Sequence, residues 1–333
     1  MKVFPSLVGG AVLSFFAFRT FASKRGISFS NRVVLITGAS RGLGFILARE
    51  FLKEGAKVIL CARSTKELNA AQKYLQSYGS TVLTYPCDVS HEEDAEKMVE
   101  FVFQKFGRLD VLINNAGIIQ VGPVEVMTNK DFSEIMAINF SGAIHTTLSA
   151  LPKMQRNGRI INITSIGGAV AVPHLLPYVA SKFAMVGFSL GLRAELLERG
   201  IKVVTVLPGL MRTGSFVNAL FKGKREAEFN WFSVGASLPL ISIDAERAAR
   251  KIVQAGRQGN AFLTIGVPAK LARILYTFAP GIGADFFSLI NRALPKATSE
   301  HMGAKSGKEI KPLKRHSTLT RLGTRAAVRF KEA

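Results

Sequence analysis

Residues 33–44 read VVLITGASRGLG, and this stretch decides the fold. Its apolar, β-branched first half predicts a buried strand, and its glycine-rich second half predicts a tight turn that leads into a helix. Glycines in such a turn let backbone N–H groups approach a pyrophosphate, and the N-terminus of the following helix favours negative charge. The stretch therefore predicts a phosphate-binding turn between a first strand and a first helix.

The alternation of strand and helix signals continues along the chain from this point. Continuous apolar runs are typical of strands that are buried on both faces, as in a parallel sheet covered by helices. The chain therefore predicts an α/β fold: a doubly wound, seven-stranded parallel sheet in a single Rossmann-type domain with N- and C-terminal extensions. The expected strands cover residues 33–37, 57–61, 81–85, 109–113, 159–164, 202–207 and 261–265, and the expected helices include 43–54, 92–106, 131–155, 177–199 and 245–255.

Four regions are expected in the chain. Residues 1–30 form an apolar and basic segment, and residues 31–267 form the catalytic Rossmann-type domain. Residues 268–298 form an apolar amphipathic extension whose apolar face is broken at Pro280, and residues 299–333 form a basic tail that we expect to be disordered.

The charge of the chain suggests an acidic partner. The net charge is +21, from 44 Lys and Arg against 23 Asp and Glu, and residues 1–30 and 301–333 together carry 11 of these charges. A solvated, disordered tail and a tail that binds anionic lipid headgroups both account for this charge. Nucleic-acid binding is disfavoured, because basic groups would then be expected on the folded face.

The N-terminal segment is apolar but short. Residues 3–18 contain no charge, whereas a membrane-spanning helix needs about 20 apolar residues. Membrane association through residues 1–20 is the favoured interpretation; a soluble, packed arm in a cytoplasmic protein and a targeting peptide are the alternatives. The two cysteines, Cys61 and Cys87, exclude a disulfide framework, and no metal-ligand spacing appears, so no metal site is expected.

Further motifs extend the pattern of the glycine turn. The glycines have the spacing T-G-x-x-x-G-x-G, and an N-N-A-G motif occupies residues 114–117. Together these motifs resemble the classical branch of the short-chain dehydrogenase/reductase family over residues 31–265. The other positions of the resemblance are Asp88, Asn139, Ser165, the Y-x-x-x-K pair Tyr178 and Lys182, Pro208-Gly209 and Thr213.

The resemblance implies a nicotinamide dinucleotide as cofactor. The residues expected to bind it are Gly38, Ser40, Arg41, Gly42, Leu43, Gly44, Arg63, Asp88, Val89, Asn115, Ala116, Gly117, Tyr178, Lys182, Pro208, Gly209 and Thr213.

The end of the second strand indicates which dinucleotide is used. An acid there would bind the adenosine ribose 2′-OH and repel a 2′-phosphate, but Ala62 stands in that place and Arg63 follows it. Arg41 and Ser40 of the glycine turn are expected beside the same ribose, and guanidinium groups suit a phosphate dianion. NADP(H) is therefore the expected cofactor, although Arg63 could also be a solvated loop residue.

Tyr178 and Lys182 lie four residues apart and share one face of a helix. The ammonium group of Lys182 would stabilise a phenolate and lower the pKa of Tyr178, which makes Tyr178 a candidate general acid/base. The resemblance implies that Ser165 donates a hydrogen bond to the substrate oxygen. It also implies that Lys182 holds the nicotinamide ribose and that Asn139 supports a proton relay.

The segment 209–243 is expected to build a lid over the substrate. It contains Met211 and five aromatic residues, which either line an apolar pocket or only pack the lid against the body. The expected substrate is a hydrophobic ketone or aldehyde, or its alcohol, and the family resemblance implies a homodimer. A membrane-associated NADPH-binding scaffold without turnover and a basic nucleic-acid-binding protein are the alternative functions.

Overall fold

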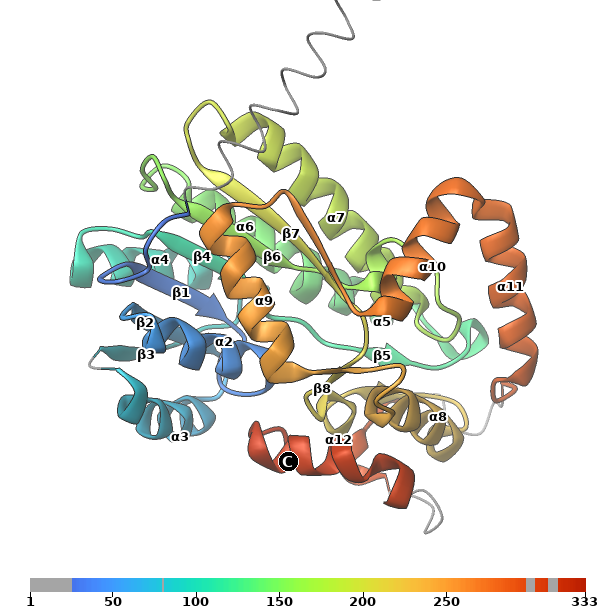
Figure 1. Cartoon of the computed structure of the whole chain (residues 1–333). Helices are drawn as coiled ribbons and strands as arrows, with labels where there is room; N and C mark the ends of the chain where they lie inside the picture. The colour runs from blue at the N-terminus through green and yellow to red at the C-terminus, as the bar shows by residue number, and fades with distance from the viewer. Residues whose placement is uncertain (1–25, 80, 298–302, 311–316) are drawn as a thin grey trace, which may run out of the picture.

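A computed structural model describes residues 26–79, 81–297, 303–310 and 317–333. Its centre is a seven-stranded sheet in the order β11-β7-β6-β4-β1-β2-β3, and every neighbouring pair is parallel (Figure 1). The predicted doubly wound parallel sheet is confirmed. The strands are β1 (Val33–Thr37), β2 (Lys57–Ala62), β3 (Val82–Pro86), β4 (Val111–Asn114), β6 (Arg159–Ile163), β7 (Lys202–Pro208) and β11 (Phe262–Ile265).

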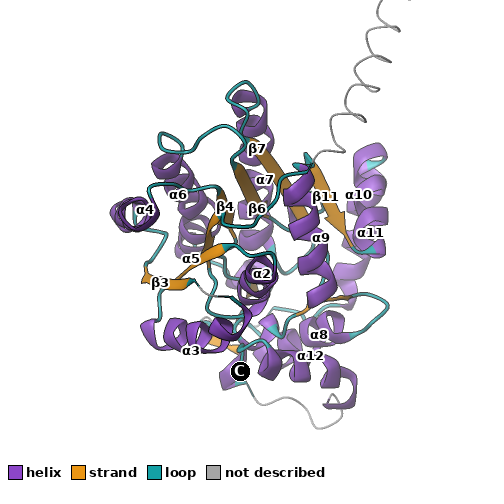
Figure 2. Cartoon of the chain, turned by 60° about the vertical axis from the view of Figure 1, so that its left-hand side comes forward, coloured by secondary structure: helices purple, strands orange, loops and turns teal. Residues whose placement is uncertain are grey.

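Helices cover both faces of the sheet (Figure 2). In β1, Val34 and Ile36 pack into the core on one face, and Val33 and Leu35 pack into the core on the other. Since side chains alternate along a strand, an unbroken apolar run is needed to fill both cores. The first core includes α2 (Gly42–Lys53), α3 (Thr65–Leu75) and α9 (Ala245–Gln258), and the second includes α4 (Glu92–Phe106), α6 (Gly142–Ala150) and α7 (Leu176–Leu196).

The strand order reverses next to β1. The chain builds β1, β2 and β3 in one direction and then crosses to β4 on the other side of β1. At such a reversal the connections beyond the carboxyl ends of the strands diverge to opposite faces and leave a crevice between them. The topology therefore places a binding site beyond the carboxyl ends of β1 and β4.

The helix expected over residues 131–155 has a more complex form. It consists of α5 (Asn129–Met136), a π-helical segment (Ala137–Ser141) and α6, which ends at Ala150. Thr128 starts α5 with a capping box that includes Asp131. The π-helical segment contains Asn139, and such local widening of a helix is frequent at functional sites.

Smaller elements build a lid after β7. They include β8 (Met211–Arg212), which pairs with β10 (Ile243–Asp244), and β9 (Leu220–Phe221), which lies between β5 (Gln120–Val121) and β12 (Lys305–Ser306). The main helix of the lid is α8 (Arg225–Ser237). Short 3-10 turns occupy Gln76–Tyr78, Val124–Val126, Ile166–Gly168, Ser215–Val217 and Gly307–Glu309.

Two helices follow the sheet and stand at one side of the molecule (Figure 1): α10 (Val267–Phe278) and α11 (Pro280–Ala293). Several of their apolar side chains are exposed, among them Leu271, Phe278 and Ile282. Within the described residues, no helix has the length and apolar character that crossing a bilayer requires. The membrane segment expected within residues 1–20 lies outside the described residues.

The prediction of a disordered C-terminal tail is wrong for the described part of it. Residues 317–329 form α12 (Ser317–Arg329), which lies against α8 at the lower edge of the view in Figure 1. A β-carbon at Gly323 would collide with Ser237 of α8, so the two helices approach closely. The buried face consists of small or polar residues and one aromatic: Thr320, Gly323, Ala326, Ala327 and Phe330.

This composition explains why α12 could not be predicted from the sequence. Leu319, Leu322 and Val328, the apolar residues that a hydropathy pattern registers, are exposed on its outer side. The packing depends on close approach through small residues, which a count of apolar positions does not detect.

Candidate active site

A cavity of about 670 Å³ lies beyond the carboxyl ends of the strands. A volume of this size suits a bound cofactor or a substrate of moderate size. Three of the predicted site residues, Gly42, Gly44 and Asn139, do not line it. The predicted residues that do line it are Gly38, Ser40, Arg41, Leu43, Arg63, Asp88, Val89, Asn115, Ala116, Gly117, Ser165, Tyr178, Lys182, Pro208, Gly209 and Thr213.

The glycine turn has the geometry of a phosphate cradle. Gly38 and Gly42 have φ angles of +64° and +57°, which favour glycine. A β-carbon at Gly38 would lie 2.8 Å from Cα of Ala116, and one at Gly44 would collide with the carbonyl oxygen of Gly38. Because glycine has no side chain, β1, the start of α2 and the segment after β4 can lie close together at these two positions. This arrangement fits a dinucleotide at the N-terminus of α2.

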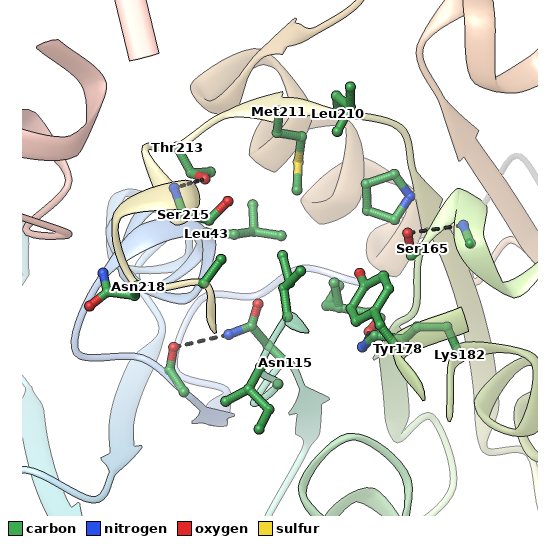
Figure 3. Close-up of a pocket in the computed structure, with 18 of the residues that line it drawn as sticks. Leu43, Asn115, Ser165, Tyr178, Lys182, Leu210, Met211, Thr213, Ser215 and Asn218 are labelled. Carbon is green, nitrogen blue, oxygen red and sulfur yellow. Dashed lines mark hydrogen bonds between the residues drawn. The ribbon is translucent and has the colours of Figure 1, made fainter. Parts of the chain in front are cut away.

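Asn115, directly after the neighbouring strand β4, fixes the turn. The Asn115 Nδ2 donates hydrogen bonds to the carbonyl oxygens of Thr37 and Gly38, at 2.9 and 3.0 Å. The backbone N–H of Asn115 donates a third hydrogen bond to Thr37 Oγ1 at 3.0 Å. Figure 3 shows Asn115 below Leu43 in the same cavity. The N-N-A-G motif thus holds the shape of the cradle from β4.

Ser165, Tyr178 and Lys182 converge at the other end of the cavity (Figure 3). Ser165 follows β6, and its Oγ accepts a hydrogen bond from the backbone N–H of Gly167 at 3.0 Å. Tyr178 and Lys182 lie on α7, and Nζ of Lys182 is 5.7 Å from the Tyr178 ring centroid. The same Nζ donates to the carbonyl oxygen of Ile163 at 3.2 Å. A hydroxyl, a phenol and an ammonium group therefore face one space.

Burial shifts the pKa values of Tyr178 and Lys182. Burial raises the pKa of Tyr178 above its usual value, and hydrogen bonding with Ser165 only partly opposes this. Burial also lowers the pKa of Lys182 to about 8. The pKa of Tyr178 is thus raised overall, and the predicted stabilisation of its phenolate by Lys182 stays a prediction. At neutral pH Tyr178 is therefore a phenol, the form that can donate a proton.

Asn139 lies behind the cavity wall and acts on it indirectly. Its Oδ1 accepts from the backbone N–H of Ile118 at 2.8 Å, and its Nδ2 donates to the Ile118 carbonyl oxygen and to Ser181 Oγ, both at 3.0 Å. Its side-chain amide is thus occupied in positioning Ile118, which lines the cavity, and Ser181 of α7. The proton relay expected of Asn139 stays a prediction.

The residues expected to bind a 2′-phosphate lie together, but they have acidic neighbours. Glu67 of α3 accepts from Ser40 Oγ at 3.0 Å and from Arg41 Nη1 at 2.6 Å. Arg63 is largely exposed, and its nearest carboxylate contact is with Asp88 at 4.0 Å. Arg63 is therefore more available to a phosphate than Arg41 is.

Glu332, which no sequence motif indicated, also lines the cavity. Its carboxylate lies 3.3 Å from Nε of Arg41, and the Glu332 side chain is 8% exposed. It was missed because the tail was expected to be disordered. The helical spacing of Gly323, Ala326, Ala327 and Phe330 was the signal that could have located it.

Some aromatic residues of the lid pack only within the lid, and others line the cavity. Phe216, Phe221 and Phe229 pack on one another within the lid and do not line the cavity, whereas Trp231 and Phe232 do. Further apolar lining comes from Val170, Leu175, Leu210, Met211 and from Phe287 of α11.

A buried polar group supports this wall. Glu228 of α8 contacts His174 Nδ1 at 2.8 Å and accepts from Trp231 Nε1 at 2.6 Å. His174 is therefore a buried residue that holds α8 in place.

Both cysteines of the chain lie beneath the cavity. Cys61 of β2 and Cys87, which follows β3, are free, buried thiols that reach its lining. Hydrogen bonding with Cys87, together with burial, raises the pKa of Cys61 well above its usual value. Cys61 therefore contributes packing rather than a reactive thiolate at neutral pH.

The fold and this arrangement define the class of protein: an oxidoreductase built on a dinucleotide-binding domain. The family model for short chain dehydrogenases matches residues 32–221, and the chain belongs to the short-chain dehydrogenase/reductase family. The cofactor of this family is a nicotinamide dinucleotide, and its substrates are small molecules.

Curated relatives and a solved structure agree with this assignment. An 11-beta-hydroxysteroid dehydrogenase A of Sesamum indicum is 34% identical over 291 residues, covering 84% of this chain and 82% of the relative. A dehydrogenase/reductase SDR family protein 7-like of Anopheles gambiae is 39% identical over 198 residues; the match covers 57% of this chain and 62% of that protein, under two thirds of its length. The crystal structure of a short-chain dehydrogenase from Streptomyces avermitilis has a TM-score of 0.68 at 29% identity, covering 80% of this chain and 99% of that one.

Proposed function

We propose that the protein is an NADP(H)-dependent oxidoreductase that interconverts a hydrophobic ketone or aldehyde and its alcohol. The observation that carries the proposal is that Ser165, Tyr178 and Lys182 line the same cavity as the glycine turn and Arg63. The names of two relatives, a hydroxysteroid dehydrogenase and a putative ketoacyl reductase of Streptomyces coelicolor, support a carbonyl or alcohol substrate. The apolar residues of the lid support a hydrophobic one.

The roles of the residues follow from their positions. When bound, the dinucleotide supplies or accepts a hydride. Ser165 donates a hydrogen bond to the carbonyl oxygen, and Tyr178 donates a proton to it as negative charge develops there. Lys182 stabilises the phenolate that remains on Tyr178. Burial favours the protonated form of Tyr178, which is the form that donates the proton in carbonyl reduction.

The preference for NADP(H) is supported by the end of β2. Ala62 offers no carboxylate to a ribose 2′-OH, and the exposed guanidinium of Arg63 lies next to the cavity. A phosphate at this place gains charge-assisted hydrogen bonds that NAD(H) cannot make.

A substrate panel tests the proposed function. Steroid, aromatic and long-chain carbonyl compounds, with small hydrophilic ones for comparison, are incubated with the full chain and NADPH or NADH. We expect oxidation of NADPH by at least one apolar compound, with a kcat/KM roughly tenfold higher than that with NADH. Arg63→Ala should remove this preference, whereas Arg250→Ala, an exposed arginine on α9, should preserve it. Turnover with none of the compounds would favour the NADPH-binding scaffold.

Two expectations about surfaces stay proposals. Attachment to an anionic membrane through residues 1–20 is supported by the exposed apolar side chains of α10 and α11. We expect the chain to float with anionic vesicles, and its variant without residues 1–25 to float less. A homodimer is supported by Phe183 and Leu190, which are exposed on α7, and by the exposed Leu197 directly after it. A monomer mass in sedimentation would contradict it.

A further inference from the structure

The C-terminal segment 330–332 meets the phosphate cradle directly. The backbone N–H of Gly42, the first residue of α2, donates a 2.8 Å hydrogen bond to the carbonyl oxygen of Phe330. Glu332 lies against Arg41, the N-cap residue of the same helix, with 3.3 Å between the carboxylate Oε2 and the guanidinium Nε. Two donors expected to serve a dinucleotide therefore already have partners from the end of the chain.

This segment is held firmly in place. Phe330 is 2% exposed and belongs to the main core, and α12 ends in a turn in which Glu332 N–H donates to the Ala327 carbonyl oxygen at 2.8 Å. Lys331 allows this turn by adopting a φ of +60°. On the lid side, Asn218 Nδ2 donates to the main-chain oxygen of Glu332 at 2.8 Å and to its carboxylate at 2.6 Å. The Glu332 carboxylate is thus held in a fixed position in the cavity wall.

The charge on this carboxylate depends on pH in the neutral range. Burial raises the pKa of Glu332 to about 7, although Arg41, Asn218 and Lys308 act to lower it; Glu67 acts with burial to raise it. Lys331 is directed elsewhere, over the rings of Phe45 and Tyr74. Arg41 therefore faces two acids, Glu67 and Glu332, of which the buried one changes its charge near pH 7.

We propose that Glu332 is a specificity-determining residue of the cofactor site: its carboxylate competes with the 2′-phosphate of NADP(H) for Arg41 and so limits the preference for NADP(H) over NAD(H). The inference rests on the proposed function and adds a residue from outside the Rossmann-type domain to it. A phosphate dianion and a carboxylate repel each other, and one guanidinium cannot pair fully with both. NAD(H) has a hydroxyl in place of this phosphate and meets no such competition.

A dependence on pH follows from the same competition. As the pH falls from 8.5 to 6.5, Glu332 gains a proton, its repulsion of the phosphate disappears and Arg41 is released. NADPH should therefore bind more tightly at the lower pH, and NADH should change little. The window stays above pH 6.5 because a phosphate monoester itself takes up a proton near pH 6.

The test compares Glu332→Gln with wild-type protein, using the full chain. Dissociation constants for NADPH and NADH are measured from pH 6.5 to 8.5 through the fluorescence of Trp231, the only tryptophan of the chain, which lines the cavity. At pH 8 we expect Glu332→Gln to tighten NADPH binding about tenfold, to leave NADH within about twofold, and to remove the pH dependence. Glu309→Gln is the matched control: it makes the same change at an exposed position of the tail.

The results of this test distinguish the specificity role of Glu332 from the proposed oxidoreductase function. Equal effects of Glu332→Gln on NADPH and NADH, or none, would overturn the specificity role, and weaker NADH binding would show instead that Glu332 binds the ribose hydroxyl. Glu332→Ala, which also removes the hydrogen bond from Asn218 to the carboxylate, should shift the ratio of the two constants in the same direction. If wild-type protein bound neither dinucleotide, the proposed function itself would fall.

Discussion

Tyr178→Phe is expected to lower kcat for carbonyl reduction by about 1,000-fold, since a positioned general acid contributes on that order. The change removes one oxygen from a half-buried ring, so the shape of the cavity and the packing of α7 are preserved. NADPH should bind to the variant with a dissociation constant within about twofold of wild type, because the phenol donates to the substrate rather than to the phosphates. Single-turnover rates and fluorescence titrations measure the two quantities separately.

Tyr85→Phe provides the control for this substitution. Tyr85 lies on β3 against Phe101 and does not line the cavity, so its loss of a hydroxyl should leave kcat unchanged. Retention of more than a tenth of wild-type kcat in Tyr178→Phe would mean that another group donates the proton.

Lys182→Met is expected to have two opposite effects: loss of activity and gain of stability. The ammonium group is buried, and the one hydrogen bond described for it goes to the Ile163 carbonyl oxygen. Without it the phenolate of Tyr178 is not stabilised, and kcat should fall by about 100-fold or more. In the folded protein the pKa of Lys182 is lowered from 10.5 to about 8, so burial of the charged form costs free energy.

The sign of the stability effect follows from this lowered pKa. Below pH 8 both the folded and the unfolded chain hold the proton, and the full cost, about 3 kcal/mol, opposes folding. As the pH rises from 8 to 10.5 the folded chain releases the proton first, and the cost disappears. Lys182→Met should therefore be more stable than wild type at pH 7 in urea unfolding, by an amount that shrinks toward pH 10.

Lys97→Met on the exposed face of α4 is the matched control, and its free energy of unfolding should stay within about 0.5 kcal/mol of wild type. Equal stability of Lys182→Met and wild type at pH 7 would mean that the ammonium group is better compensated in the fold than its contacts indicate.

The sheet could be predicted from sequence because its strands are long apolar runs that only a two-sided core can accommodate. The cradle could be predicted because glycine at 38, 42 and 44 satisfies a steric demand that is local to the turn. The protonation of Tyr178 could not, since burial by residues distant in the chain decides it. The position of Asn139 within a π-helical segment likewise depends on its bonds to Ile118, which no periodicity reveals.

The end of the chain was the least predictable part. Its basic composition suggested solvent or a lipid surface, yet Gly214 leaves room for Ala327, and the chain then turns inward to Glu332. Contacts of this kind depend on the shape of a distant surface. They link residues that are more than a hundred positions apart, and composition contains no information about them.

The two buried thiols give the protein an intrinsic reporter. Because Cys61 and Cys87 are the only cysteines of the chain and both reach the cavity lining, a thiol reagent can label the protein only beneath the cofactor pocket. Labelling should be slow at neutral pH, since the pKa of Cys61 is raised, and slower still when a dinucleotide covers the pocket. The rate of modification therefore measures occupancy without any engineered probe.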